Sequence, residues 1–141
     1  ALVPLTFGPE ILERFKPIAG VAVDAIVSAG KTSFEEALLF THRGFSGPAI
    51  LQISSYWREG EEISINFQPG FGIFDELKSQ RAENGRQAIG TAMSVFLPKR
   101  LAQLLAADCG LIGNLADQSD RKLKAPEAWL RDWRIKPTGS D

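Results

Sequence analysis

The spacing of apolar residues changes near Pro69, and this change constrains the fold more than any other feature of the sequence. Before Pro69, apolar and polar residues alternate, most clearly over 62–67, with the two-residue period of a strand that buries one face. After Pro69, apolar residues recur three and four positions apart, as over 88–96, which is the period of an amphipathic helix. The sequence therefore predicts a β-rich first part and a helical second part.

The β-rich part is expected to form a small antiparallel sheet or barrel. Alternating faces predict a strand over 21–28, and a turn at 30–33 connects it to a second strand over 34–41. A strand at the N-terminus and a short helix over 10–15 precede this pair, and the alternation at 62–67 adds a further strand.

The helical part is expected to contain three to four helices. Apolar stripes predict helices over the ranges 74–84, 88–96, 98–110 and 125–133. Short connections between such helices are typical of a small antiparallel bundle. We therefore predict an α+β fold with two subdomains. A barrel-like, β-rich subdomain covers 1–69, with a corner helix at 47–57, and a helical subdomain covers 70–141, with a return strand near 133–136.

Composition limits the classes of function. The chain has 141 residues, a formal net charge of −1, and 16 basic against 17 acidic side chains that form no long blocks. This distribution lacks the basic footprint of a nucleic-acid-binding protein, so we predict no nucleic-acid partner. No segment approaches the roughly 20 apolar residues that span a bilayer, and no secretory signal is visible, so we expect no membrane partner and a cytoplasmic location.

Few residues in the chain suggest catalysis or cofactor binding. A single cysteine, Cys109, and a single histidine, His42, exclude an internal disulfide and argue against a metal site. The segment 70–75 supplies only two of the three glycines of a dinucleotide fingerprint and is interpreted as a loop between the subdomains. Cys109 is interpreted as a small packing residue. No catalytic residue can be identified from these patterns.

The candidate site is the corner at residues 41–47, between a predicted strand and a predicted helix. Ser46 or Gly47 can cap that helix, and Pro48 can occupy its first turn. The imidazole of His42 could exchange protons with a ligand beside the helix start. The interpretation we favour is that it hydrogen-bonds a loop carbonyl and holds the shape of the corner, and both interpretations stay open.

The most distinctive sequence motif in the chain is Thr41-His42-Arg43-Gly44-Phe45-Ser46-Gly47-Pro48-Ala49, within the run 38–57. Further characteristic segments lie in the ranges 1–6, 19–23, 64–69, 97–101 and 132–139. Together, and in this order, they resemble the bacterial BaiN/YhiN-like flavoproteins, a family of NAD(P)/FAD-dependent oxidoreductases. The similarity covers essentially the whole chain.

The resemblance implies one part of a larger enzyme. In such flavoproteins the FAD fold is discontinuous, and this chain resembles the inserted domain on the substrate side of the redox centre. FAD is therefore expected in the full-length protein, with no cofactor-binding residue and no activity in this chain alone. The expected partners are the flavin-binding domain of the same polypeptide and a small-molecule substrate.

The same similarity indicates which residues line the pocket, namely Thr41, His42, Gly44, Ser46 and Gly47. Both ends of the chain look cut from something longer, which favours the inserted domain. The alternative is a free-standing binding or protein-interaction module that shares the fold.

Overall fold

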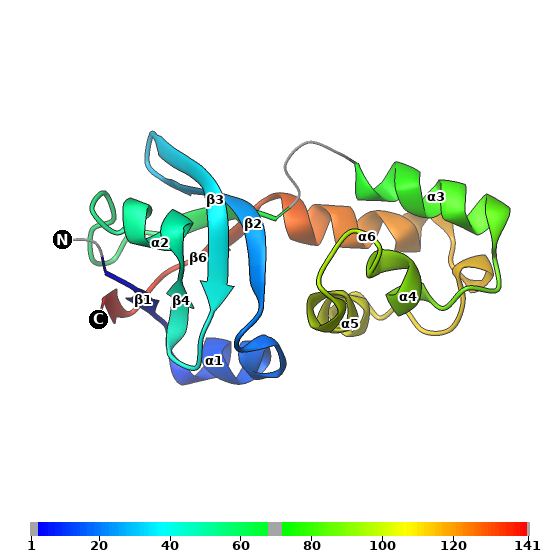
Figure 1. The fold of residues 1–141 in the computed structure, drawn as a ribbon, viewed down its shortest axis with the longest axis horizontal. Helices are drawn as coiled ribbons and strands as arrows, with labels where there is room; N and C mark the ends of the chain where they lie inside the picture. The colour runs from blue at the N-terminus through cyan, green and yellow to red at the C-terminus, as the bar shows by residue number, and fades with distance from the viewer. Residues whose placement is uncertain (1–2, 68–71, 141) are drawn as a thin grey trace.

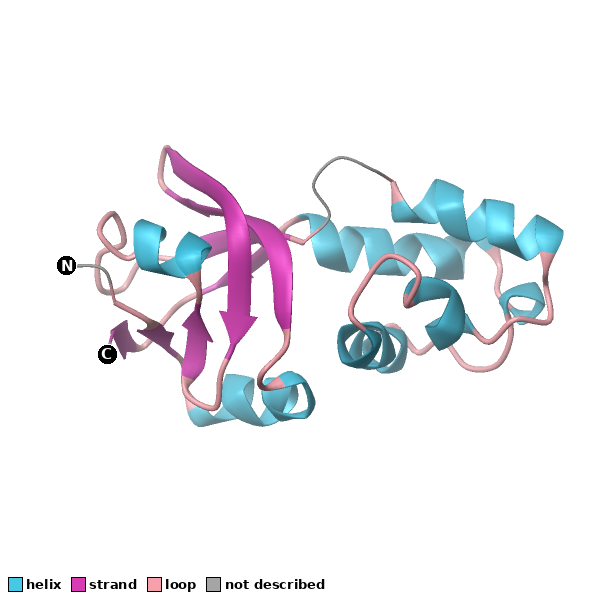
Figure 2. Ribbon diagram, in the orientation of Figure 1, coloured by secondary structure: helices cyan, strands magenta, loops and turns pink. Residues whose placement is uncertain are grey.

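The structure is a computed structural model that describes residues 3–67 and 72–140, and it confirms an α+β fold (Figure 1). A seven-stranded antiparallel sheet lies at one end of the molecule and a group of helices lies at the other (Figure 2). We call residues 3–67 and 133–140 the sheet lobe and residues 72–132 the helical lobe. The subdomain boundary expected at residue 69 lies outside the described residues.

The sheet has the strand order β6-β5-β2-β3-β4-β1-β7, and every neighbouring pair is antiparallel. The strands are β1 (Leu5–Thr6), β2 (Ala22–Ala29), β3 (Thr32–Phe40), β4 (Gly44–Ser46), β5 (Ile63–Asn66), β6 (Trp133–Ile135) and β7 (Gly139–Ser140). The edge strands β6 and β7 are joined by only three residues, which span at most about 14 Å. Because a flat sheet of this size would separate its edges by about 29 Å, the sheet must curl towards a barrel.

The long hairpin of β2 and β3 is the centre of the sheet lobe. It pairs over the whole of β2, from Ala22 opposite Leu39 to Ala29 opposite Thr32. On its other side β2 pairs with β5 only over 26–28. In this register the residues opposite 22–24 would be 68–70, which lie outside the described residues.

Aromatic side chains fill the sheet lobe and extend to the helices. The rings of Phe40 and Phe45 lie 5.1 Å apart, edge to face, and both are buried. Trp129 and Trp133 stack with centroids 5.8 Å apart, and Trp129 also stacks on Phe67 at 5.9 Å. Because Trp129 belongs to the last helix, this cluster packs the two lobes against each other.

The helical lobe contains α3 (Ile73–Glu83), α4 (Ile89–Met93), α5 (Lys99–Asp108), the 3-10 turn η2 (Leu115–Asp117) and α6 (Asp120–Arg131). The last helix begins at Asp120 and not near 125, because Ser119 caps it by accepting a hydrogen bond from the Lys122 N–H at 3.2 Å. Pro126 therefore lies inside the helix, where it is buried. Within the described ranges, no helix combines the length and apolar character needed to cross a bilayer.

Three short helical segments cover the sheet lobe: α1 (Pro9–Phe15), the 3-10 turn η1 (Lys16–Ile18) and α2 (Pro48–Ile53). The corner helix α2 is shorter than the predicted range 47–57. It ends at Ser54, whose hydroxyl donates a hydrogen bond to the Leu51 carbonyl at 2.7 Å. Such a side-chain bond to the backbone competes with continued helical geometry.

Polar contacts join the two lobes on one side. Arg14 of α1 forms an ion pair with Asp108, the last residue of α5, at 2.6 Å between Nη2 and Oδ2. The indole N–H of Trp129 donates to the same carboxylate oxygen at 3.3 Å. Arg100, near the start of α5, donates to the Ala19 carbonyl at 3.1 Å. The lobes are thus connected by charge-assisted bonds as well as by apolar packing.

Candidate functional site

The predicted corner contains a tight turn between β3 and β4. Helix α2 begins just after β4. The Thr41 hydroxyl donates to the Gly44 carbonyl at 3.1 Å and accepts from the Gly44 N–H at 3.1 Å and the Arg43 N–H at 3.3 Å. The Thr41 N–H also donates to the Gly44 carbonyl, at 2.8 Å. The pattern read as strand, turn and helix therefore contains an additional strand, which the sequence reasoning missed because β4 has only three residues.

Two glycines of the corner are required by the backbone. A Cβ at Gly44 would collide with the Leu5 carbonyl oxygen on the neighbouring strand. Gly47 has a φ of +90°, and a Cβ there would lie 2.9 Å from the Leu39 nitrogen. Gly47 is the N-cap of α2, whereas Ser46, the other predicted cap, belongs to β4.

The structure brings three of the five predicted pocket residues together. Thr41, His42 and Ser46 line a shallow cavity of about 330 Å³ beside β1. Thr41 and His42 also line a second cavity of about 310 Å³, where Glu13 and Lys16 form part of the wall. Gly44 and Gly47 shape the turn instead of forming these walls. The assignment of the five residues to a ligand pocket stays a prediction.

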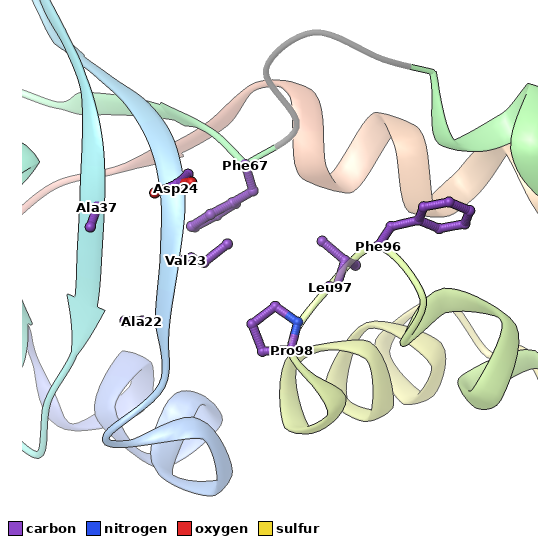
Figure 3. A pocket seen from close by; sticks show the side chains of 8 residues that line it. All are labelled: Ala22, Val23, Asp24, Ala37, Phe67, Phe96, Leu97 and Pro98. Carbon is purple, nitrogen blue, oxygen red and sulfur yellow. The ribbon is translucent and has the colours of Figure 1, made fainter.

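A larger cavity, of about 390 Å³, lies between the two lobes (Figure 3). We call it the junction groove, and its walls are formed by Ala22, Val23, Asp24, Ala37, Phe67, Phe96, Leu97 and Pro98. In Figure 3, Phe67 points towards Val23, whereas the ring of Phe96 is directed away from the groove into the helical lobe. Sequence reasoning did not find this groove, since four separate segments of the chain contribute to it. Pro98 was interpreted only as a helix start and as part of the segment 97–101 that resembles the family.

The chemistry of the junction groove is mostly apolar with a few polar groups. Asp24 contributes an exposed carboxylate, and Ala22 and Val23 of β2 line the groove beside it. The groove therefore suits a flat ligand that has apolar faces and a polar edge.

Cys109 lies next to the ion pair that joins the lobes. Burial, and to a lesser extent the adjacent charge of Asp108, raises the pKa of Cys109 to about 11. The thiol therefore stays protonated at neutral pH and is a weak nucleophile. Among the described residues, no group of three His, Cys, Asp or Glu side chains is placed to hold a metal ion.

Comparison with known proteins relates the whole chain to one family. Residues 1–141 match the family model described as the HI0933-like protein barrel and H2TH domain. A curated relative from Escherichia coli K12, named ribosomal RNA dihydrouridine synthase, is 41% identical over 146 residues, which cover 99% of this chain. A relative of the same name from Haemophilus influenzae is 32% identical over 145 residues and 100% of the chain. The chain spans only 36% and 35% of the lengths of these relatives.

These matches confirm the predicted resemblance and correct the predicted partners. The relatives are named for an activity on ribosomal RNA, so the expectation of a small-molecule substrate and no nucleic acid is wrong. The error came from using a formal net charge of −1 as a guide to the surface. Net charge averages over the whole molecule, whereas a nucleic acid contacts one local region of it.

Proposed function

The chain belongs to the HI0933-like family, of which it is the barrel and H2TH domain, and we propose that it is the RNA-binding domain of an FAD-dependent ribosomal RNA dihydrouridine synthase. In this proposal the domain holds the RNA against the redox centre and has no activity alone. The observation that carries it is the 41% identity, across 99% of the chain, to a protein named for that activity.

The reaction places two demands on such a domain. Converting uridine to dihydrouridine adds a hydride and a proton across the C5=C6 bond of the uracil ring, and the hydride would come from a reduced flavin in the complete enzyme. Enzymes that act on a base need it out of the stack, either in a single strand or flipped from a duplex. The domain must therefore hold the RNA backbone and also provide a recess that receives one unstacked base.

The junction groove has properties that suit the base. Its volume of about 390 Å³ falls within the range of about 300–1,000 Å³ that is typical of ligand pockets. Its apolar walls can cover the faces of a ring, and the Asp24 carboxylate can accept a hydrogen bond from the uracil N3–H.

The fold of this chain does not fit FAD, which carries hydride chemistry in flavoenzymes. Dinucleotides bind where a glycine-rich turn connects a strand to a helix in a parallel βαβ unit. Every strand pair among the described residues is antiparallel, so that unit is missing from them. We therefore assign the flavin to another part of the gene product and assign this chain the binding and orientation of RNA.

The proposal is tested in a strain that lacks the gene, by mass spectrometry of nucleosides from its ribosomal RNA. Deletion should remove dihydrouridine, and the complete wild-type gene should restore it. If deletion leaves dihydrouridine unchanged, the proposed function is refuted.

A steric variant tests the role of the junction groove. Ala22→Trp in the complete protein should lower kcat/KM for rRNA from the deletion strain at least about ten-fold, since a misplaced base reacts poorly. Ala107→Trp is the matched control, because Ala107 is also exposed but lies on α5 outside the groove. Equal activity of the two variants would contradict the proposed role of the junction groove in binding the base.

A further inference from the structure

We propose that RNA runs across the helical lobe over a face that α3 and α6 form together, where Lys78 and Lys124 contact phosphates and Phe74 stacks on a base. This inference rests on the proposed function, and it names the surface that holds the RNA backbone. We call the residues Phe74, Lys78, Arg81, Asp120 and Lys124 the α3–α6 face.

The geometry of the face comes from two lysines that share one aromatic ring. The Lys78 ammonium lies 5.1 Å from the centroid of the Phe74 ring, and the Lys124 ammonium lies 5.2 Å from it. The two charges are therefore at most about 10 Å apart, although they come from different helices. Both lysines are exposed, and Phe74 is half-buried. In the free protein the two ammonium groups thus lie over the ring. In the proposed complex they move from the ring to the phosphates, which frees a face of Phe74 for a base.

The charge of the face is positive, although it contains an acid. Asp120 forms an ion pair with Arg81 at 2.5 Å between Oδ1 and Nη2. A hydrogen bond from Arg81 is the main cause that lowers the pKa of Asp120, and the charges of Arg81, Lys78 and Lys124 act in the same direction. Three cations thus surround one carboxylate, which Arg81 already neutralises, so the two lysines supply an excess of positive charge.

Two further acids lie near Phe74: Asp75 of α3, whose carboxylate is directed towards Gly72 at the start of that helix, and Glu127 of α6, which is paired. Glu127 accepts a hydrogen bond from the Phe74 N–H at 3.3 Å and lies 3.6 Å from a guanidinium nitrogen of Arg131. Its charge is therefore directed at a backbone amide and an arginine. The arrangement favours an anionic partner at the lysines.

The combination of charge and ring selects a nucleic acid among anionic partners. Proteins that bind single strands place cations along the backbone and aromatic rings under the bases. Successive phosphates of one strand follow each other closely enough for two ammonium groups within about 10 Å to contact neighbouring phosphates. Phe74 lies at the end of α3 that is nearer to the sheet lobe (Figure 1). A strand that crosses this face can therefore continue towards the junction between the lobes.

Binding of ribosomal RNA from the gene-deletion strain to the complete gene product tests the lysines. The Lys78→Ala/Lys124→Ala variant should bind roughly ten-fold more weakly, as expected for two lost phosphate contacts. The slope of log affinity against log salt should fall in magnitude by about 1.4, because each single-strand phosphate contact contributes about 0.7. The control Lys31→Ala/Arg58→Ala removes two exposed cations of the sheet lobe and should change neither quantity.

Two further variants separate charge and stacking from folding. Lys78→Arg/Lys124→Arg keeps both charges and should retain wild-type affinity and salt slope. Phe74→Leu keeps an apolar side chain but removes the ring, and it should weaken binding about five-fold or more. Phe34→Leu, which changes a half-buried ring of the sheet lobe, is its control and should not alter binding. Circular dichroism verifies that each variant is folded.

The outcomes distinguish this inference from the proposed function. If the wild-type protein binds and modifies ribosomal RNA while the double alanine variant matches its control, the α3–α6 face is refuted and the proposed function stands. If the wild-type protein neither binds nor modifies ribosomal RNA, both are refuted. A ten-fold loss with an unchanged salt slope would also overturn the inference, because it would show that the lysines contact no phosphates.

Discussion

The turn at residues 41–47 and the junction between the lobes are held together in different ways. In the turn, Thr41 bonds to residues that are two and three positions away in the chain. At the junction, Arg14 pairs with Asp108, 94 positions away, and Arg100 bonds to Ala19, 81 positions away. The first is a local arrangement, and the second depends on the complete fold.

This difference explains why the turn can be recognised from the sequence, whereas the junction cannot. The turn is conspicuous because several positions in a row must satisfy backbone geometry, as Gly44 and Gly47 do. Such density indicates a constrained backbone, which need not be a reactive site. The junction groove and the α3–α6 face take their residues from distant segments, so no single run of sequence marks them. In this chain the most distinctive run of sequence and the surfaces that we propose to bind RNA are therefore different.

The largest effect is expected for a change in the turn itself. Gly44→Ala should lower the free energy of unfolding by about 3 kcal/mol or more, because the new Cβ meets the Leu5 carbonyl where β1 pairs with β4. Gly60→Ala is the control: its φ is +90°, but nothing lies within 4 Å of its Cβ. The control should cost only about 1–2 kcal/mol. Urea unfolding followed by tryptophan fluorescence measures both, and equal losses would contradict the steric explanation.

A smaller effect is expected when the turn loses its hydrogen bonds but keeps its shape. Thr41→Val removes the hydroxyl that bonds Gly44 and Arg43, and it should lower the free energy of unfolding by about 1–2 kcal/mol. Thr32→Val, at the start of β3, should change the free energy of unfolding by less than about 0.5 kcal/mol. If Thr41→Val were as mild as this control, the turn would not depend on its local bonds.

The junction should respond more weakly to the loss of one polar contact. Asp108→Asn removes the ion pair with Arg14 and should lower the free energy of unfolding by about 1 kcal/mol, because both side chains are partly exposed. The difference from wild type should shrink in 1 M salt, where charge interactions are screened. A loss that does not depend on salt would show that the contact acts through packing and not through charge.

The last effect is absent at neutral pH: it is a pH dependence at the same junction that begins near pH 9. Because the pKa of Cys109 is raised to about 11 in the folded state, the folded chain keeps this proton when the unfolded chain, with an ordinary pKa of 9.0, has lost it. The contribution of Cys109 to stability is thus complete below pH 9 and is lost as the pH rises towards 11. Cys109→Ala should lose less stability than wild type over this interval in unfolding titrations. Parallel curves for the two proteins would contradict the shift.

Sequence reasoning predicted the fold better than it predicted the site. The strands at β2, β3 and β5 and the helices α3 and α5 fall close to their predicted ranges, because each shows its period over many residues. It missed β4, which has only three residues. It also misplaced the start of α6, which is set by the capping residue Ser119. For the site, Thr41, His42 and Ser46 lie beside one cavity, and their role as a ligand pocket stays a prediction. Sequence reasoning missed the junction groove, and the names of the relatives contradict its exclusion of a nucleic-acid partner.

By itself, the sequence determined the α+β class, the division into sheet and helices, and membership of the family. These follow from periodicity and from short runs of residues, which are local properties set by backbone hydrogen bonding and by the burial of one face. Only the tertiary structure decided where Asp24 and Pro98 meet across a groove, and that Lys78 and Lys124 share the ring of Phe74. Such contacts depend on how the lobes and helices pack together. Packing brings together residues that are far apart in the sequence, so no local sequence pattern predicts the contact.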